Sequence, residues 1–195
     1  MFIFKLTFWL AIIAQMAIRA PLAKQRRKEA KSESRYGSQE KLILILLFIS
    51  GFVTPLLYSV TSWLDFANYS LPGWAGWLGI ALILVALWIF WRGHYDLGLN
   101  WSPTLEIRPE HKLITNGIYG YIRHPMYASQ WVWVIAQSLL LQNWLAGFLS
   151  VVVWTIFYSL RVPPEEKMML DTFGDEYREY MTRTGAVFPK LSKGK

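Results

Sequence analysis

The residues best suited to chemistry lie at the two ends of one long apolar stretch. Residues 123–127 have the sequence RHPMY and lead into the uncharged stretch 126–160, and residues 161–166, with the sequence RVPPEE, follow it. If the stretch folds back on itself, cations, carboxylates and aromatic rings meet at one membrane surface. Pro125 suits the first turn of a helix, and the N–H groups at such a helix start suit an anionic ligand. The pattern predicts a site for a polar cofactor beside a lipid-tailed substrate.

Several other kinds of site are excluded by the residue types present. The sequence has no Cys, which excludes disulfides, thiolate metal ligands and a thiol nucleophile. The spacing of His94, His111 and His124 matches no metal motif, and no nearby carboxylate pair completes a ligand set, so no metal site is expected. There is also no GxGxxG after a strand, no P-loop and no GxSxG. A nucleotide-like cofactor is therefore not expected to be held by a Rossmann domain.

The composition indicates helices in a lipid bilayer. Hydrophobic residues make up 54% of the chain, and they form long runs at 2–18, 42–64, 74–91 and 126–160. The last run is too long for one span, because 35 residues make a helix of about 50 Å against a hydrocarbon core of about 30 Å. The pair at 142–143, Gln-Asn, is the natural turn. We therefore predict an all-α integral membrane protein with five transmembrane helices, the last two forming a tight helical hairpin.

The distribution of charge predicts the orientation of these spans. Lys and Arg gather in segments 19–41, 92–125 and 161–195, whereas the connection between the second and third spans and the 142–143 turn contain none. With five spans, the three basic segments fall on the same side of the membrane. The positive-inside rule places that side, with the active site and the C-terminus, in the cytoplasm and the N-terminus outside. Orientation accounts for the net charge of +7, so nucleic acid is not expected as a partner.

Two regions with different roles are expected along the chain. Residues 1–91, with three spans and no motif, are interpreted as a transmembrane scaffold. Residues 92–195 are interpreted as the catalytic region. It begins with a cytoplasmic loop that includes a short hairpin around 105–118, continues with the helical hairpin 126–160, and ends with a cytoplasmic amphipathic helix or helix pair over 164–184. The prolines at its start and the glutamates in its first turn favour a new helix there.

The order of the motifs over residues 90–190 resembles the isoprenylcysteine carboxyl methyltransferase family. The Arg-His-Pro-x-Tyr element alone is only moderately specific, but it is strong in combination with the elements that follow it. These elements are Y-x3-RHP-x-Y from Tyr119, R-x3-EE from Arg161 and FG-x-EY-x2-Y from Phe173, closing on Arg183 and Pro189.

This resemblance implies S-adenosylmethionine as methyl donor, S-adenosylhomocysteine as product and a prenylcysteine carboxylate as acceptor. The prenylated cysteine would belong to a protein C-terminus or to a small molecule. Arg161 would bind the substrate carboxylate and serve as the catalytic residue. An ionised carboxylate needs no general base to attack the sulfonium methyl, so catalysis would consist of orientation and exclusion of water. The implied cofactor-binding residues are His111, Lys112, Leu113, Ile114, Tyr119, His124, Pro125, Met126, Tyr127 and Glu165.

Three alternatives stay open at the level of sequence. A sterol- or polyprenol-type membrane reductase would use NADPH, with Arg108, Lys112 and Arg123 near its 2′-phosphate. A phospholipid N-methyltransferase would need a base to deprotonate its amine acceptor, and the sequence identifies none. A non-catalytic membrane scaffold would not need cations and carboxylates gathered at both ends of one hairpin.

Overall fold

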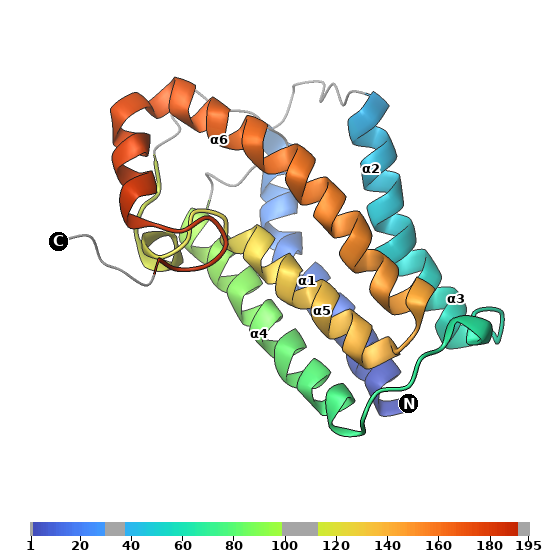
Figure 1. Cartoon of the computed structure of the whole chain (residues 1–195). Coiled ribbons are helices and arrows are strands. Elements are labelled where there is room, and N and C mark those ends of the chain that lie inside the picture. Colours follow the sequence, from blue (N-terminus) through green and yellow to red (C-terminus); the bar gives the residue numbers. More distant parts are fainter. Residues whose placement is uncertain (1, 30–37, 99–112, 191–195) are drawn as a thin grey trace.

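The fold is all-α, as predicted. The computed structural model describes residues 2–29, 38–98 and 113–190, and these contain helices and two isolated bridges but no strand. Figure 1 shows the helices packed as a bundle. The α-helices are α1 (Phe2–Glu29), α2 (Ser38–Phe48), α3 (Thr54–Val60), α4 (Trp74–Leu97), α5 (Pro125–Leu141) and α6 (Leu149–Arg183). Short helices are the π-helices η1 (Ile49–Val53) and η5 (Trp144–Phe148) and the 3-10 helices η2 (Asp65–Ala67) and η4 (Gly117–Gly120).

Four helical segments are long and apolar enough to cross a membrane. They are Phe2–Pro21, Lys41–Val60, Trp74–Leu97 and Trp144–Arg183 among the residues that the structure describes. The remaining helix of the predicted hairpin, α5, has 17 residues, about 26 Å at 1.5 Å per residue. The protein is therefore an integral membrane protein by the character of its helices, and the count of five spans stays a prediction.

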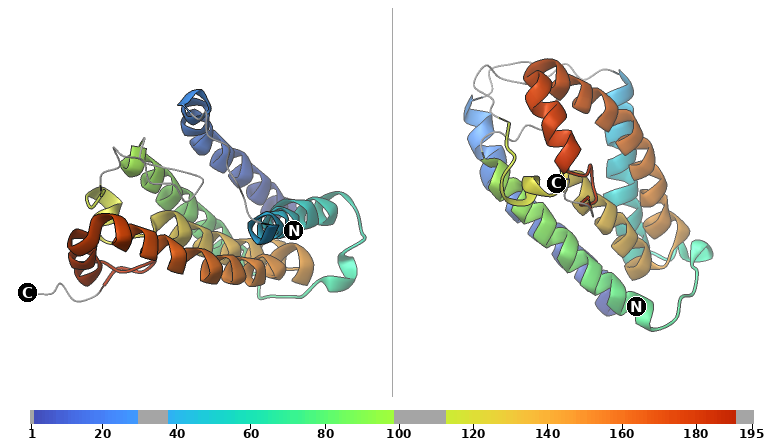
Figure 2. Two further views of the ribbon diagram at one scale, coloured as in Figure 1. Left: turned by 90° about the horizontal axis from the view of Figure 1, so that it is seen from above. Right: turned by 60° about the vertical axis from the view of Figure 1, so that its left-hand side comes forward.

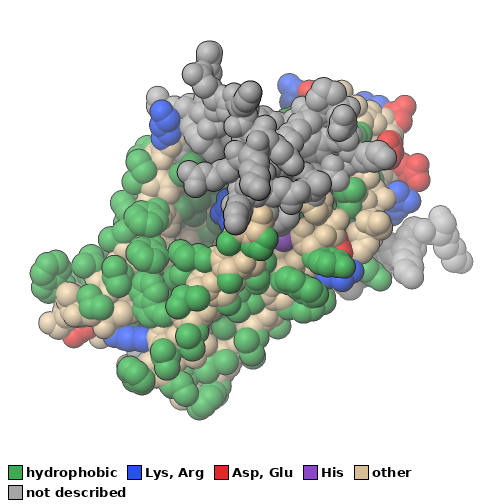
Figure 3. Space-filling view, turned by 180° about the vertical axis from the view of Figure 1, so that it is seen from behind, with side chains coloured by type: hydrophobic (Ala, Val, Ile, Leu, Met, Phe, Trp, Pro, Cys, Tyr) green, Lys and Arg blue, Asp and Glu red, His purple; other side chains and the backbone are tan. Residues whose placement is uncertain are grey.

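The outer surface of the bundle is the surface expected of a protein in lipid. In Figure 3, hydrophobic side chains are spread over the part of the face that the described residues form. Large apolar residues are exposed along the helices, including Leu10 on α1, Phe48 on α2 and Leu84 on α4. In water these side chains would destabilise the fold, but in a bilayer they face a medium as apolar as the protein core.

The predicted turn at 142–143 is confirmed, and it is held from two sides. Gln142 adopts a left-handed conformation, with φ 47°, and ends α5. The buried Asn143 side chain caps η5 by accepting the N–H groups of Leu145 and Ala146, at 3.0 and 2.9 Å. Its amide donates to the Leu64 carbonyl at 2.7 Å, beyond the end of α3. One side chain therefore closes the α5–α6 hairpin and ties it to the second span.

The second span contains a local defect beside Pro55. Pro55 has no N–H to donate, and the π-helix η1 directly precedes α3, in whose first turn Pro55 lies. A buried glutamine on α5 binds both π-helices, because Gln137 Nε2 donates to the carbonyl of Ser50 in η1 at 3.1 Å and of Ala146 in η5 at 2.7 Å. This amide satisfies carbonyls that the wider helical turns leave without a normal partner.

Helices α4 and α5 lie side by side along their length, as Figures 1 and 2 show. Glycines make the close approach possible at both ends of the contact. A Cβ on Gly79 would lie 3.0 Å from Leu140 Cγ, and a Cβ on Gly93 would lie 3.5 Å from Pro125 Cβ. The start of α5 is therefore packed directly against the last turns of α4, and this contact places the site described below.

The prediction that Pro163 and Pro164 start a new helix is wrong. Helix α6 runs from Leu149 to Arg183 through both prolines. Each proline removes one N–H donor from the helix. The following turn is held by the contacts of Glu165 and Glu166 with Tyr127 and His124 at the start of α5. The break lies instead at Gly174, whose φ of 53° interrupts the helix and turns its last part back, as Figure 1 shows. Of the two predicted forms, the helix pair is the better description.

Candidate active site

The start of α5 is fixed by backbone hydrogen bonds to the chain that follows α6. His124 is the N-cap residue and Pro125 the first residue of the helix, as its missing N–H allows. The amides of Arg123 and His124 donate to the carbonyls of Gly185 and Ala186, at 2.8 and 2.9 Å. Two segments about sixty residues apart in the chain thus run together and present their side chains to the same space.

Arg123 is bound within the protein rather than exposed to an anionic ligand. Its Nε and Nη2 donate to Glu166 Oε1 at 3.1 and 2.9 Å, and its Nη1 donates to the Thr184 carbonyl at 2.6 Å. The Arg123 side chain is only 9% exposed. A planar guanidinium with three of its N–H groups engaged in this way holds α5, α6 and the 184–186 segment together.

His124 lies between the two glutamates of α6. Its Nε2 is 3.2 Å from Glu166 Oε1, and its Nδ1 is 3.5 Å from Glu165 Oε1. Burial alone would lower the pKa of the imidazole, but its hydrogen bonds to Glu165 and Glu166 outweigh burial and raise the pKa above its usual value. Both ring nitrogens face acceptors, which suits the doubly protonated imidazolium.

The raised pKa of His124 predicts a loss of stability at alkaline pH. The folded state holds the proton more tightly than the unfolded chain, so the stabilisation is complete below about pH 6.5 and is lost as the pH rises through the folded-state pKa. The apparent Tm of the ligand-free protein should therefore fall as the pH rises above about 6.5 and through the folded-state pKa of His124, and His124→Gln should flatten that part of the profile. Parallel profiles of the two proteins would contradict the imidazolium assignment.

Tyr127 joins the cluster from one turn farther along α5. Its hydroxyl donates to Glu165 Oε2 at 2.6 Å, and its ring centroid lies 5.5 Å from that of His124. Its ring also lies 6.0 to 6.2 Å from the rings of Trp154, Phe157 and Tyr158 on α6. The aromatic residues form an apolar wall that continues from the charged cluster along the hairpin.

Arg161 lies close enough to Tyr127 and Glu165 to act on both electrostatically. The predicted convergence of the two hairpin ends is therefore confirmed. The cluster contains Arg123, Arg161 and His124, against the carboxylates of Glu165 and Glu166. When His124 is protonated, three positive and two negative charges leave one net positive charge, which suits a ligand set that includes an anion.

Tyr119 is buried in η4, beside the last turns of α4. Its hydroxyl donates to the Gly93 carbonyl at 3.3 Å, and its own carbonyl accepts the Tyr180 hydroxyl at 2.6 Å. Burial raises the pKa of Tyr119, so this hydroxyl stays protonated and remains a donor. Tyr119 therefore links α4 to the part of α6 beyond the Gly174 bend.

The other predicted cofactor residues lie on two neighbouring segments. Leu113 and Ile114 are half-buried and are separated from η4 by Thr115 and Asn116, whereas Pro125 is buried and Met126 half-buried against Gly93. His111 and Lys112 lie outside the described residues, as does most of the hairpin predicted at 105–118, and its described part, 113–118, contains no strand. The described residues also contain no group of three metal-ligating side chains.

Sequence reasoning missed Asp96, which binds the segment carrying Tyr119. Its Oδ2 accepts the Arg92 guanidinium at 3.0 Å and the Ile118 amide at 2.7 Å. Only the i, i+4 spacing to Arg92 is visible in the sequence, and that is a common surface pattern. The contact with Ile118 joins residues 22 positions apart and has no sequence signal.

Comparison with known proteins identifies the same family that the motifs resemble. The family model described as the isoprenylcysteine carboxyl methyltransferase (ICMT) family matches residues 77–171. The protein-S-isoprenylcysteine O-methyltransferase of Schizosaccharomyces pombe is 37% identical over 83 residues, which cover 42% of this chain and 35% of that protein. Protein-S-isoprenylcysteine O-methyltransferase B of Arabidopsis thaliana is 27% identical over 161 residues, which cover 79% of this chain and 81% of the relative.

The fold is similar to that of a solved structure, the eukaryotic intramembrane Ras methyltransferase ICMT. The TM-score is 0.54 at 22% identity, and the match covers 83% of this chain and 56% of that one. The chain thus spans a little over half of the solved structure and about a third of the fission yeast relative.

Proposed function

Because the chain belongs to the isoprenylcysteine carboxyl methyltransferase family, we propose that it is a membrane methyltransferase. Its methyl donor would be S-adenosylmethionine and its acceptor the carboxylate of a prenylated cysteine, giving a methyl ester. The relatives' names supply the reaction class, and the contacts at the hairpin ends supply the residues.

The observation that carries this proposal is the meeting of His124 and Tyr127 on α5 with Arg161 and Glu165 on α6. The two glutamates of α6 are bound by His124 and Tyr127 at the start of α5, so the charged groups have fixed positions before any ligand arrives. An apolar aromatic wall adjoins them. The charged groups suit a polar cofactor, and the aromatic wall suits the lipid tail of the acceptor.

The groups at the start of α5, on α6 and before η4 suit the parts of S-adenosylmethionine. Its carboxylate would be met by the N–H groups of Met126 and Tyr127, which have no carbonyl in a preceding turn of α5 to bond. Its ammonium group would be met by Glu165, and its adenosine by the segment from Leu113 to Tyr119. His111 and Lys112 are proposed for the same end, outside the described residues. When bound, the cofactor supplies an electrophilic methyl group on a sulfonium.

Arg161 is proposed to orient the acceptor carboxylate toward that methyl group. The carboxylate is ionised at neutral pH, so the protein needs to hold it in line rather than to activate it. His124 is poorly suited to be a base, because both of its ring nitrogens already face carboxylate oxygens of Glu165 and Glu166, and these contacts raise its pKa. Orientation and exclusion of water by the aromatic wall are therefore the expected sources of rate.

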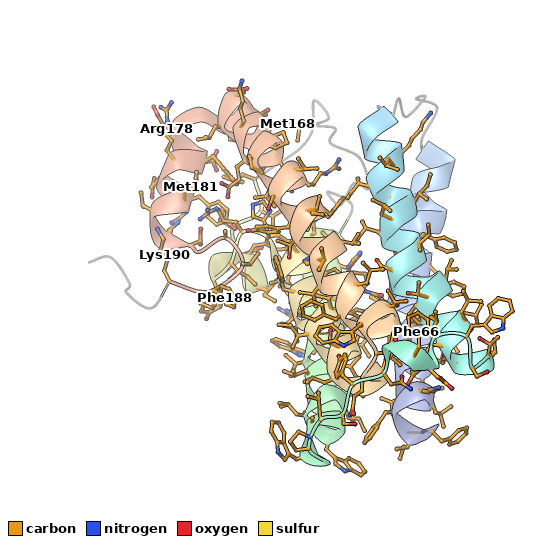
Figure 4. All side chains as sticks on the ribbon, turned by 45° about the vertical axis from the view of Figure 1, so that its right-hand side comes forward. Phe66, Met168, Arg178, Met181, Phe188 and Lys190 are labelled. Carbon is orange, nitrogen blue, oxygen red and sulfur yellow. The ribbon has the colours of Figure 1, made fainter. Side chains whose placement is uncertain are left out.

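We also propose that the end of the molecule that carries the charged cluster faces the cytoplasm, with the N-terminus outside. At the opposite end, the residues after α3 contact the hairpin turn through Leu64 and Asn143. Figure 4 shows Phe66 at that end, and Arg178 and Lys190 at the other. Lys and Arg at the second end follow the positive-inside rule, and residues 1–91 would act as the scaffold.

The reductase alternative is weakened by Arg123. An NADPH 2′-phosphate needs cations that are free to bind it, whereas Arg123 is engaged by Glu166 and Thr184. The other two cations that this reading requires, Arg108 and Lys112, lie outside the described residues. S-Adenosylhomocysteine at about 100 times its Kd should stabilise the protein by about 2.7 kcal/mol, and NADPH should not.

The decisive experiment is methyl transfer from labelled S-adenosylmethionine to N-acetyl-S-farnesylcysteine by protein in detergent or lipid. Base-labile label in the product would establish a carboxyl methyl ester. Absence of transfer by folded protein that binds S-adenosylhomocysteine would reject this acceptor but keep the methyltransferase. Protection by NADPH without binding of S-adenosylhomocysteine would replace the proposal by the reductase, and base-stable label in a phospholipid would replace it by an N-methyltransferase.

A further inference from the structure

Asp96 occupies a position on α4 that local energetics disfavour. It is in the last turn of the helix, where a carboxylate meets the negative end of the helix dipole, which is unfavourable. Its side chain is only 7% exposed, so it also loses hydration. Arg92, one turn earlier, compensates for part of this cost through its contact at 3.0 Å.

The second contact of Asp96 leaves its own helix. The carboxylate accepts the Ile118 amide in η4 at 2.7 Å, a short charge-assisted hydrogen bond. Gly117 makes this approach possible, because its φ is 58° and a Cβ at that position would overlap the Asp96 carboxylate. The left-handed glycine and the buried carboxylate therefore fit one another as a pair.

The same two turns of α4 hold both proposed walls of the cofactor site. Asp96 binds Ile118, and the Gly93 carbonyl accepts the Tyr119 hydroxyl. On its other side, Gly93 packs against Pro125 at the start of α5. The last turns of α4 thus set the distance between η4, together with the chain leading into it from Leu113, and the His124–Tyr127 segment.

From these contacts we infer that Asp96 is a positioning residue for the nucleoside end of the cofactor. It does not touch the reacting atoms. It fixes η4, and thereby the backbone proposed to meet adenosine, relative to the start of α5. The inference rests on the proposed function, since it assigns a role toward S-adenosylmethionine.

Asp96→Ala removes the hydrogen bond to Ile118, and Asp96→Asn keeps an oxygen that can accept it. We expect Asp96→Ala to raise the Kd for S-adenosylhomocysteine and the KM for S-adenosylmethionine about tenfold or more, because a charge-assisted hydrogen bond is lost. The kcat at saturating cofactor and the KM for the prenylcysteine should stay within about threefold, and Asp96→Asn should recover most of the affinity.

The matched control is Asp175→Ala. Asp175 also pairs with an arginine, Arg178 at 2.6 Å, but its side chain is 93% exposed and it lies on the outer part of α6. This variant should bind S-adenosylhomocysteine as the unchanged protein does. Binding is measured by calorimetry on the whole protein in detergent, and hydrogen exchange of the Ile118 amide should rise only in the Asp96→Ala variant.

Three results would overturn the inference. The first is an unchanged Kd for S-adenosylhomocysteine in Asp96→Ala. The second is a fall in kcat, with kcat/KM falling equally for S-adenosylmethionine and for the prenylcysteine, which would indicate a general structural defect. The third is an unchanged exchange rate of the Ile118 amide. If the unchanged protein itself fails to bind S-adenosylhomocysteine, the proposed function fails first, and the inference fails with it. Calorimetry on the unchanged protein therefore separates the two failures.

Discussion

Replacing Arg161 by alanine is expected to lower kcat/KM for methylation of a prenylcysteine about a thousandfold, because charge orientation at the reacting group is lost. The Kd for S-adenosylhomocysteine should stay within about threefold, because Glu165 keeps its bonds to Tyr127 and His124. The measurement is initial-rate kinetics with both substrates varied, together with calorimetric binding of the product. A fall in kcat/KM for the prenylcysteine without a change in the Kd for S-adenosylhomocysteine distinguishes an arginine that orients the substrate from one that stabilises the fold.

Two further variants sharpen the Arg161 experiment. Arg161→Lys keeps the charge but not the planar fork, so an intermediate loss is expected. Arg183→Ala is the control, since Arg183 is on the same helix, is 56% exposed and makes only a 3.8 Å contact with Glu179. Its kinetics should not change. An equal loss of turnover and cofactor affinity in Arg161→Ala would remove Arg161 from the proposed role.

The hairpin shows which part of the fold can be predicted from sequence. A run of 35 uncharged residues is too long for one span, and the polar pair Gln142-Asn143 lies near its middle. Length and polarity therefore decide the turn, and the turn decides that Arg123-His124 and Glu165-Glu166 meet. The contact of Asn143 with the Leu64 carbonyl joins residues 79 positions apart, so it depends on the fold and has no signal in the sequence.

The roles of individual charged residues were less predictable, because their partners are distant in the chain. Arg123 was expected near an anionic ligand, but Glu166 and the Thr184 carbonyl satisfy it. A backbone carbonyl 61 positions away leaves no trace in the sequence. The wrong prediction of a helix start at Pro163 and Pro164 has a related cause. Prolines favour a first helical turn, but the partners of the next turn, where Glu165 and Glu166 contact the start of α5, are distant in the sequence.

The motif Phe173-Gly174-x-Glu176-Tyr177 has a structural explanation that its sequence alone did not give. Gly174 supplies the positive φ that turns the end of α6 back toward η4. Tyr177 and Tyr180 then become buried, and Tyr180 donates to the Tyr119 carbonyl. The motif therefore packs the last part of α6 against Tyr119 of η4, which is a structural role.

Arg123 is the residue whose loss should destabilise the protein most. Arg123→Ala leaves Glu166, which is 21% exposed, and the Thr184 carbonyl without their guanidinium partner. Breaking a largely buried pair by removing one member costs about 3 to 5 kcal/mol. For a chain of this size each kcal/mol corresponds to about 2 to 4 °C, so the apparent Tm should fall by at least about 6 °C.

Arg178→Ala is the matched control for this prediction. Arg178 and Asp175 form a pair at 2.6 Å, shorter than the 2.9 Å of Arg123 and Glu166, but the two side chains are 71% and 93% exposed. Exposed pairs contribute about 0 to 1 kcal/mol, so the Tm of this variant should change by less than about 3 °C. Similar shifts in the two variants would mean that Arg123 is no more than another surface charge. A large shift confined to Arg123→Ala would support its role as the link between α5, α6 and the segment after α6, the framework on which the site at the hairpin ends depends.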